Sequence, residues 1–408
     1  MRIGSGALGE KRTARGHRIL VTGGTGFLGS HIAFALLREG YPVTVLARSS
    51  KTLAARDRID CLADWFGLEE EARRRLSVAE GDILDPGWAA KAADGACGPG
   101  EVDEIVHCAS ATSFAERKRA EVEAVNIGGL RNVLDFAARG RTVFFHHVST
   151  AFAAGKRTGL CREDWIESAD FTNVYEETKA RGEVLARDLC RREGIRLNVY
   201  RPSIVYGDSR TGRSLRFNAL YFPVKAAVFL RDIYLADIRE RGGRKAAELG
   251  IRMKEDGGLF MPLRIEVGRE GGLNLVPIDH CVGVFMAILE DGLEGGVYHI
   301  VNSRPTKIED IVDHAKRLFR LDGVETCGPE GFGARPKNAL ETLYDSYLDA
   351  YRPYMQDLRT FEIKNATPVS ERHALVCPEF DYDVFARCMD YAVEAGWGTR
   401  LFREQGAG

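Results

Sequence analysis

The stretch RILVTGGTGFLG, residues 18–29, decides the fold. An apolar, strand-like run is followed at once by Gly23, Gly26 and Gly29 and then by a segment with helical periodicity. At a strand-to-helix corner such glycines allow a tight turn, close approach of the backbone to a pyrophosphate, and close helix packing. The N-terminus of the helix also offers free N–H groups to phosphates. The stretch predicts a dinucleotide-binding corner, with an ordinary glycine-rich turn as the alternative.

Outward from this corner, strand-like apolar runs alternate with segments that have apolar residues three and four positions apart. This alternation is typical of parallel βαβ units, whose central strands are buried on both faces. The sequence therefore predicts an α/β fold with a doubly wound, Rossmann-type parallel sheet. The predicted strands are 18–22, 43–47, 77–80, 104–108, 143–149 and 197–201, and the predicted helices are 27–38, 51–75, 118–139 and 175–192.

The pattern changes after residue 208. Residues 209–272 carry charge clusters and a possible helix at 221–235, without regular strand alternation until 273–276. A strand–helix–strand return follows, and the remainder of the chain looks mostly helical. We predict a smaller, discontinuous substrate lobe beside the sheet. The predicted division is a mobile tail at 1–16, a dinucleotide-binding domain at 17–208 and 273–304, and a substrate lobe at 209–272 and 305–408.

Composition limits the classes of function. The 408 residues hold 57 Lys+Arg and 59 Asp+Glu, and the formal charge of −2 gives no global reason to bind nucleic acid. Nine cysteines without a CxxC pair argue against a disulfide framework or a zinc site, so we expect no metal and a cytoplasmic location. The apolar segment 219–230 is too short for a transmembrane span, and we predict a soluble protein.

The end of the second predicted strand bears on the choice of dinucleotide. Arg48, Ser49 and Ser50 stand where a carboxylate would bind the ribose 2′-hydroxyl of NAD. A cation and two hydroxyls suit a 2′-phosphate, so NADP(H) is the predicted cofactor, unless Arg48 only extends from the strand end into solvent. Asp82, just past the third strand, either meets the adenine amino group or braces the turn before Pro86.

Tyr175 and Lys179 form a YxxxK pair on one face of a predicted helix. A neighbouring ammonium favours the phenolate, so the pair predicts an acid/base tyrosine whose pKa lies below its usual value. A solvated helix face would produce the same spacing by chance. The pair follows the fifth predicted strand, whose Ser149 and Thr150 would reach the crevice at the carboxyl ends of the strands.

Taken together, these motifs resemble an extended short-chain dehydrogenase/reductase. The resemblance lies in TGGTGFLG (22–29), GDI (81–83), HCAS (107–110), Asn126, VST (148–150), YEETK (175–179) and RPSIVYG (201–207). It implies that Thr150, with Ser149 as the fallback, polarises a carbonyl. Tyr175 would exchange the proton, and Lys179 would hold the nicotinamide ribose. The cofactor-binding residues that it implies are Thr22, Gly23, Thr25, Gly26, Phe27, Leu28, Gly29, Arg48, Asp82, Ile83, Ala109, Ser110, Lys179, Pro202 and Ser203.

Within that family the chain resembles the fatty acyl reductase (male-sterility) and thioester reductase branch, through Arg48, HHVSTA (146–151), GDSRTG (207–212) and NLVPID (274–279). This branch implies NADPH-dependent hydride transfer to an acyl thioester or a related apolar carbonyl, giving an aldehyde and, as an open point, an alcohol. The donor would be acyl-CoA or an acyl carrier protein in trans, and a homodimer is the implied assembly. The alternatives are an NAD-dependent nucleotide-sugar epimerase or dehydratase, and a dinucleotide-binding regulator without chemistry.

Other polar residues are interpreted as mainly structural. His146 and His147 lie on a buried strand, where satisfied core histidines are expected, and Cys108 is expected to be a small buried hydrophobe. Asn126 either braces the catalytic helix or carries a water relay. Residues 220–230 form either an acyl-facing lid, in which Pro223 interrupts any helix, or the packing of the second lobe.

Overall fold

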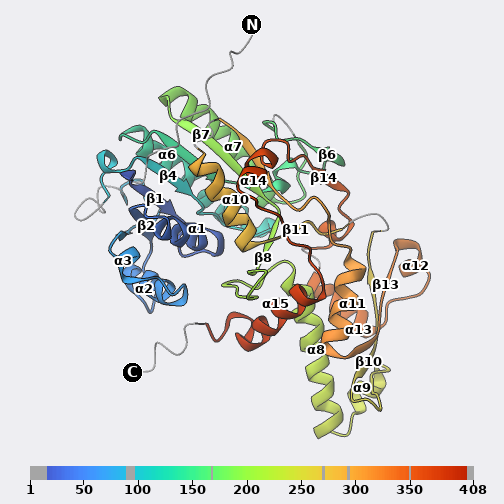
Figure 1. Ribbon diagram of the computed structural model, residues 1–408. Coiled ribbons are helices and arrows are strands. Elements are labelled where there is room, and N and C mark those ends of the chain that lie inside the picture. Colours follow the sequence, from blue (N-terminus) through green and yellow to red (C-terminus); the bar gives the residue numbers. More distant parts are fainter. Residues whose placement is uncertain are drawn as a thin grey trace.

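A parallel sheet of seven strands forms the centre of the computed structural model, which describes residues 16–88, 97–166, 169–268, 272–291, 295–348 and 351–401 (Figure 1). The strand order is β12-β7-β5-β4-β1-β2-β3, and every neighbouring pair is parallel. The order reverses between β1 and β4, so the doubly wound sheet is confirmed. The strands are β1 (Ile19–Thr22), β2 (Val43–Ala47), β3 (Leu76–Glu80), β4 (Glu104–His107), β5 (Phe144–Val148), β7 (Arg196–Pro202) and β12 (Val297–Ile300). The predicted tail, 1–16, lies outside the described residues except for Gly16.

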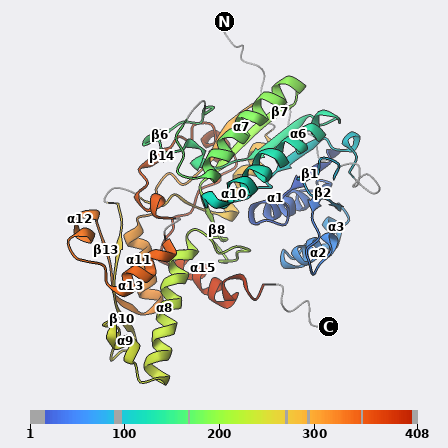
Figure 2. The ribbon, with the colours of Figure 1, turned by 180° about the vertical axis from the view of Figure 1, so that it is seen from behind.

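Helices cover both faces of this sheet. One face packs against α1 (Phe27–Arg38), α2 (Ala55–Trp65), α3 (Glu70–Arg73) and α10 (Ile278–Glu290). The other face packs against α6 (Leu130–Ala138) and α7 (Val174–Glu193), which stand in front in Figure 2. Because both faces are covered, the strands β1, β2, β4 and β5 are buried along their whole length.

Two of the predicted helices are interrupted. The helix predicted at 51–75 divides into α2 and α3 near Gly67, whose backbone is left-handed with φ +60°. The helix predicted at 118–139 consists of a 3-10 turn (Glu116–Lys118), α5 (Arg119–Glu123), a π-helical turn (Ala124–Gly129) and α6. A Cβ at Gly129 would come 2.6 Å from Cδ1 of Ile83, so this turn packs directly against the loop after β3.

A second group of elements lies beyond one end of the central sheet, at the lower right of Figure 1. Its three-stranded sheet has the order β13-β10-β9. Helices α8, α9, α11, α12, α13 and α15 lie around it (Figures 1 and 2). The bounds are α8 (Tyr221–Glu240), α9 (Arg244–Glu248), β9 (Arg252–Met253), β10 (Leu259–Glu266), α11 (Ile308–Phe319), β13 (Leu321–Cys327), α12 (Pro329–Gly333), α13 (Ala339–Leu348) and α15 (Tyr382–Glu394).

The absence of strand alternation before residue 273 was therefore a wrong prediction. Along β10, buried residues alternate with half-buried ones, which is the period of a strand with one covered face. Pro262 and the charged Arg264 conceal that period in the sequence. The structure accommodates Pro262 at a register shift between Phe260 and Leu263, where the ladder with β13 is irregular. β13 likewise lies in a region that was predicted to be mostly helical.

The helix predicted at 221–235 is present as α8, but the expected interruption at Pro223 is wrong. Pro223 does not interrupt it, because it stands in the first turn, where a backbone N–H has no intrahelical partner. Val224, Val228 and Leu230 are buried in the core that this part of the molecule forms, together with Leu263 and Phe385. That core joins side chains from both segments of the predicted lobe. Val369, from the C-terminal segment, packs instead into the core of the central sheet, and the domain boundaries themselves stay a prediction.

Two short parallel pairs connect the parts of the fold. β8 (Ile204–Tyr206) pairs with β11 (Leu275–Pro277), and β6 (Gly159–Cys161) pairs with β14 (Arg359–Phe361). The second pair brings the C-terminal segment to the loop that follows β5. A further helix, α14 (Thr367–Arg372), packs against α10. Among the described residues, no helix combines the length and the apolar composition that crossing a bilayer requires.

Candidate active site

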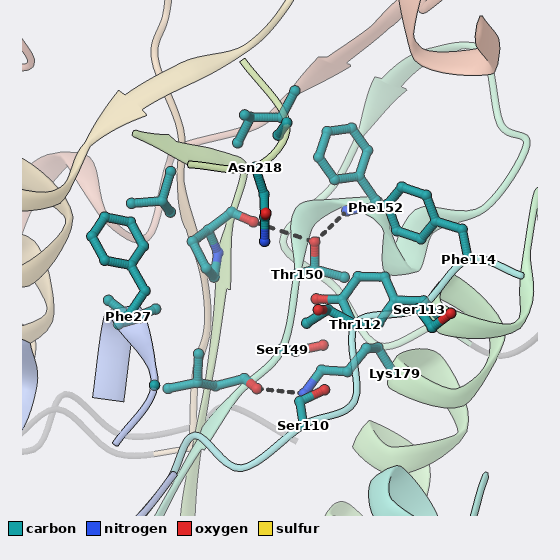
Figure 3. Close-up of a pocket in the computed structure, with 18 of the residues that line it drawn as sticks. Phe27, Ser110, Thr112, Ser113, Phe114, Ser149, Thr150, Phe152, Lys179 and Asn218 are labelled. Atoms are coloured by element: carbon teal, nitrogen blue, oxygen red, sulfur yellow. Dashed lines mark hydrogen bonds between the residues drawn. The ribbon is translucent and has the colours of Figure 1, made fainter. Parts of the chain in front are cut away.

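A cavity of about 1060 Å³ opens at the carboxyl ends of β1, β4, β5 and β7 (Figure 3). This is the edge where the strand order reverses, and in open α/β sheets ligands bind there. The glycine corner and the YxxxK pair both reach this cavity, although about 150 residues separate them in the chain. Predicted site residues that line it are Gly23, Gly26, Phe27, Leu28, Gly29, Ser110, Ser149, Thr150, Tyr175, Lys179, Pro202 and Ser203.

The glycine corner leaves backbone rather than side chains facing the cavity. Gly23 has φ +72°, and a Cβ there would lie 2.5 Å from the backbone nitrogen of Ala109. A Cβ at Gly29 would lie 2.4 Å from the carbonyl oxygen of Gly23. The helix α1 begins at Phe27, and Gly26 provides no side-chain cap for its first N–H groups. The corner thus presents unoccupied N–H donors, which favour an anion at the helix N-terminus.

Two buried hydroxyls in the cavity wall have no hydrogen-bond partner in the part of the chain that the structure describes. They are the Oγ atoms of Ser149 and Ser203. A buried hydroxyl without a partner is costly, so these atoms indicate that the cavity takes a ligand with polar groups. Together with the glycine corner, they fit a dinucleotide whose pyrophosphate lies at the corner and whose other end reaches Ser149 and Ser203.

The predicted adenosine-end residues lie outside the cavity lining. Nη1 of Arg48 donates to Oδ2 of Asp82 at 3.0 Å, and Oδ1 of Asp82 accepts from the backbone nitrogen of Leu84 at 3.0 Å. Asp82 therefore braces its turn and binds Arg48, while an adenine contact stays a prediction. Ser49 is bonded to Glu80. Ile83 packs against Gly129, as described above, and is not among the lining residues, so its predicted contact with a cofactor stays a prediction.

Sequence reasoning missed two further cations near Arg48. Arg58, on α2, donates to the carbonyl oxygen of Arg48. Burial, and then the neighbouring charges of Arg48 and Arg216, lower the pKa of Arg58. Arg216 also lines the cavity. Arg58 stands one turn into the helix after the second strand, so its place near Arg48 could have been predicted from spacing. Arg216 lies far away in the chain, so its place could not.

Thr22 and Ala109 support the corner from behind. The hydroxyl of Thr22 is hydrogen-bonded to Nδ1 of His107 at 2.9 Å, and the backbone nitrogen of Ala109 donates to Oγ1 of Thr22 at 3.4 Å. Thr25 is half-buried in the turn between β1 and α1. None of the three lines the cavity, so their predicted contact with a cofactor stays a prediction.

Thr150, Tyr175 and Lys179 meet at the other side of the cavity. Oγ1 of Thr150 accepts from the nitrogen of Phe152 at 3.3 Å and donates to the carbonyl oxygen of Pro202 at 3.4 Å (Figure 3). The phenol of Tyr175 lies close enough to the Thr150 hydroxyl for that hydroxyl to lower its pKa. Nζ of Lys179 donates to the carbonyl oxygen of Val148 at 2.6 Å. The strand end and the helix start thus bring two hydroxyls and an ammonium to one place.

Local sequence explains why α7 begins at this place. Oδ1 of Asn173 caps the helix by accepting from the backbone nitrogen of Glu176 at 3.0 Å. Because α7 begins at Val174, Tyr175 lies in its first turn. Lys179 follows four residues later and therefore lies one turn further on the same face. Both side chains then point to the cavity from a rigid element.

Burial controls the protonation of this pair. Burial raises the pKa of Tyr175 to about 12, and the nearby charge of Glu176 raises it further, while the neighbouring Thr150 hydroxyl acts in the opposite direction. Burial also lowers the pKa of Lys179 to about 8, while Glu183 and Cys108 act in the opposite direction. The prediction that Lys179 brings the phenol below its usual pKa is wrong for this structure. Tyr175 is a neutral hydrogen donor at physiological pH.

Asn126 acts as a brace. Its Oδ1 accepts from Oγ of Ser110 at 3.0 Å and from the nitrogen of Ala111 at 2.8 Å. Its Nδ2 donates to the carbonyl oxygen of Ala111 at 3.1 Å and to Oγ1 of Thr178 at 2.9 Å. The amide has four hydrogen-bonding positions, and these contacts occupy them all. Of the two alternatives, the structure supports the brace, which ties the loop after β4 to α7.

The two strand histidines differ from each other. His146 is bonded to Tyr200 at 2.9 Å and to Glu104 at 3.0 Å, as expected for a satisfied core histidine. His147 is also buried, and its ring stacks on that of His107 with the centroids 5.7 Å apart. Neither ring nitrogen is hydrogen-bonded to a described residue. The prediction that His147 is a satisfied core histidine is therefore wrong. Burial, with Lys179 and His107 adding to it, lowers the pKa of His147 well below its usual value.

Cys108 is only partly buried and lines the cavity, so it is more exposed than predicted. Burial raises its pKa to about 12 and keeps it a thiol.

An aromatic wall completes the cavity, and sequence reasoning missed it. Phe114 lies 5.9 Å from the ring of Tyr175 and 5.9 Å from the ring of Tyr351. Phe152 lies on the same side as Phe114, across the cavity from Phe27 in Figure 3, and Pro353 and Ala219 also line the cavity. Residues 220–230 are not among the lining residues, so the structure favours packing over a lid. The wall joins segments far apart in the chain, so no local pattern signals it.

Comparison with known proteins agrees with this architecture. The family model described as male sterility protein, an NAD-binding family, matches residues 21–284. A component of the linear gramicidin synthase of Brevibacillus parabrevis is 24% identical over 398 residues, which cover 92% of this chain and 7% of that protein. The chain thus corresponds to a small part of this much longer relative.

Two solved structures share the fold over nearly the whole chain. The terminal R domain of the myxalamid PKS-NRPS pathway has a TM-score of 0.73 at 20% identity, covering 97% of this chain and 93% of that one. A thiolation-reductase di-domain of an archaeal non-ribosomal peptide synthetase has a TM-score of 0.67 at 17% identity, covering 94% and 76%.

The fold and the site define a protein of the extended short-chain dehydrogenase/reductase class, whose members are NAD(P)-dependent oxidoreductases. Because the family model matches more than half of its residues, the chain belongs to the male sterility protein family. The resemblance found in the sequence is thereby confirmed.

The Gly23→Ala variant is expected to lose NAD(P)H affinity more than tenfold, because the methyl group meets Ala109 and forces the corner to open. Gly67→Ala is the matched control: its φ is also positive, at +60°, but no described atom lies within 4 Å of the added Cβ. Both variants carry backbone strain, and only the first is expected to lose binding. Fluorescence titration with NAD(P)H measures the affinity of each variant. Equal affinities for the two variants would contradict cofactor binding at the glycine corner.

Affinity for NAD(P)H is also expected to fall as pH rises through about 8. Lys179, with its pKa lowered to about 8, becomes a neutral amine above that pH and loses its charge and one hydrogen-bond donor. Tyr175, with a pKa of about 12, does not titrate in this range. Titrations between pH 6 and 10 test this, with Lys179→Met as the control in which the pH dependence disappears. An unchanged affinity across that range would show that the Lys179 charge has no part in binding.

Proposed function

We propose that this protein is an NADPH-dependent reductase that converts an acyl thioester to an aldehyde. The observation that carries the proposal is the single cavity that unites the glycine corner, the Thr150–Tyr175–Lys179 group and an aromatic wall. The first holds a dinucleotide, the second handles a carbonyl oxygen, and the third suits an apolar acyl chain. Whether an alcohol forms in a second reduction stays open.

The donor is proposed to arrive on another molecule, as acyl-CoA or on an acyl carrier protein. Support for a carrier comes from the relatives, since one similar structure is a thiolation-reductase di-domain and another is the terminal R domain of a synthetase. The apolar side of the cavity, at Phe114 and Tyr351, would take the acyl chain. A cytoplasmic location and a homodimer remain predictions; all nine cysteines are free thiols, which supports a reducing compartment.

Each residue of the group has a defined part in the reaction. NADPH, held at the glycine corner, would supply the hydride that reduces the thioester carbonyl carbon. The hydroxyls of Thr150 and Tyr175 hold the carbonyl oxygen, and Tyr175, protonated below about pH 12, can donate its proton there. The carbon–sulfur bond then breaks, and the products are the aldehyde, the free thiol and NADP⁺, with one proton consumed. Lys179 is proposed to bind the cofactor's ribose from beside Val148.

Three observations favour NADP(H) over NAD(H). Arg48 follows β2 directly, and its side chain is 65% exposed, so it can turn toward a phosphate. Arg58 and Arg216 add positive charge beside it. The charges of Arg48 and of Arg216 both act on Arg58, and a 2′-phosphate would offset that repulsion.

NADPH oxidation in the presence of a panel of acyl-CoA and acyl-carrier thioesters tests the reaction. We expect turnover with wild-type protein and, for Tyr175→Phe, a turnover lower by about 10² to 10⁴, since the variant has no proton to donate. NADPH affinity should stay within about twofold, because the ring remains in place. No turnover with any thioester would overturn the proposal. NAD released on denaturation would instead favour a nucleotide-sugar epimerase or dehydratase.

The cation cluster is tested by Arg48→Ala and Arg58→Ala. Each is expected to weaken NADPH binding by about tenfold to a hundredfold, because a charged hydrogen bond is worth about 1.5–3 kcal/mol, and to leave NADH binding unchanged. Arg56→Ala is the matched control, since Arg56 lies on the same helix but is exposed and paired with Asp60 at 3.0 Å. Equal losses for both nucleotides would contradict a 2′-phosphate site.

A further inference from the structure

A carboxylate is fully buried beside the proposed proton donor. Glu176 follows Tyr175 in the first turn of α7, and its side chain has no exposed surface. Its Oε2 accepts from the backbone nitrogen of Thr172 at 3.0 Å. Burying a carboxylate is costly unless it is paired and hydrogen-bonded, so the partners of Glu176 determine where this turn can lie.

The main partner is a tyrosine from the C-terminal segment. Oη of Tyr354 donates to Oε1 of Glu176 at 2.7 Å and accepts from Nδ2 of Asn173 at 2.8 Å. Asn173 caps α7 through the backbone nitrogen of Glu176. These three side chains close a ring of hydrogen bonds around the start of α7. Burial, and then the adjacent Glu176 carboxylate, raise the pKa of Tyr354, so it stays a proton donor.

Arg359 connects the same carboxylate to the turn that carries Thr150. Its Nη1 lies 3.8 Å from Oε1 of Glu176 and donates to the carbonyl oxygen of Gly155 at 2.8 Å. Gly155 ends the 3-10 turn Ala151–Ala154, of which Thr150 is the N-cap. The guanidinium also lies over the ring of Phe152 at 4.8 Å, and Asp357 holds it at 2.8 Å. One buried cation therefore touches both elements that supply the hydroxyl pair.

We propose that Tyr354 and Arg359 are positioning residues that hold the first turn of α7 against the turn after β5, so that the hydroxyls of Tyr175 and Thr150 meet. This inference rests on the proposed function. The same C-terminal segment lines the cavity at Tyr351 and Pro353, beside Phe114, whose ring lies 5.5 Å from that of Tyr354. A single segment thus contacts the proposed acyl side of the cavity and aligns the proton donor.

Tyr354→Phe tests this with the loss of one oxygen atom. We expect kcat to fall at least tenfold while the KM for the thioester and the affinity for NADPH stay within about twofold, because alignment and not binding is lost. Arg359→Lys should keep more activity than Arg359→Met, since the lysine retains the charge. The matched control is Tyr344→Phe, because Tyr344 is also buried and its hydroxyl donates to Pro223 at 3.2 Å, away from the cavity.

A second readout does not depend on turnover. With ¹³Cζ-labelled tyrosine, the resonance of Tyr175, assigned by its absence in Tyr175→Phe, is expected to shift in Tyr354→Phe and to stay in place in Tyr344→Phe. An unmoved resonance, or equal kcat losses in Tyr354→Phe and Tyr344→Phe, would overturn the inference. A wild-type protein that reduces no thioester while the resonance still shifts in Tyr354→Phe would support the positioning and overturn only the proposed function.

Discussion

The backbone of Gly23 lies directly against the backbone of Ala109, and this contact leaves no room for a side chain between them. It joins the ends of β1 and β4 at the point where the strand order reverses. Because Gly23 and Gly29 keep the corner free of side chains, the start of α1 faces the cavity with its N–H groups available. The cavity, and every residue that meets in it, depends on this close approach.

Inside the cavity, desolvation outweighs the pairing of charges. The ammonium of Lys179 is one turn from Tyr175, yet it is bound to the carbonyl of Val148, and burial is the larger influence on both groups. The result is a phenol that stays protonated and an amine that titrates near pH 8. The Oγ atoms of Ser149 and Ser203, which are buried without a hydrogen-bond partner among the described residues, line the same cavity and could bond to a bound nucleotide.

The C-terminal segment, residues 351–361, contacts both the cavity and the start of α7. Its contacts with α7 run through Tyr354 and Arg359, and its contacts with the cavity run through Tyr351 and Pro353. The short pairing of β14 with β6 holds the segment beside the loop after β5. The segment therefore links the side of the cavity proposed for the acyl chain to the side that carries the hydroxyl pair, and both depend on where residues 351–361 lie.

Local pattern determined which segments form the central strands and helices, the glycine corner and the face shared by Tyr175 and Lys179, because each depends on residues close together in the chain. The run at 18–29 and the spacing of Tyr175 and Lys179 are both of this kind. Tertiary structure alone decided the rest. β10 was concealed by Pro262, which only the irregular ladder with β13 accommodates. The cation Arg216, the wall at Phe114 and Tyr351, and the raised pKa of Tyr175 arise from burial and from contacts between distant segments, which no spacing along the chain records.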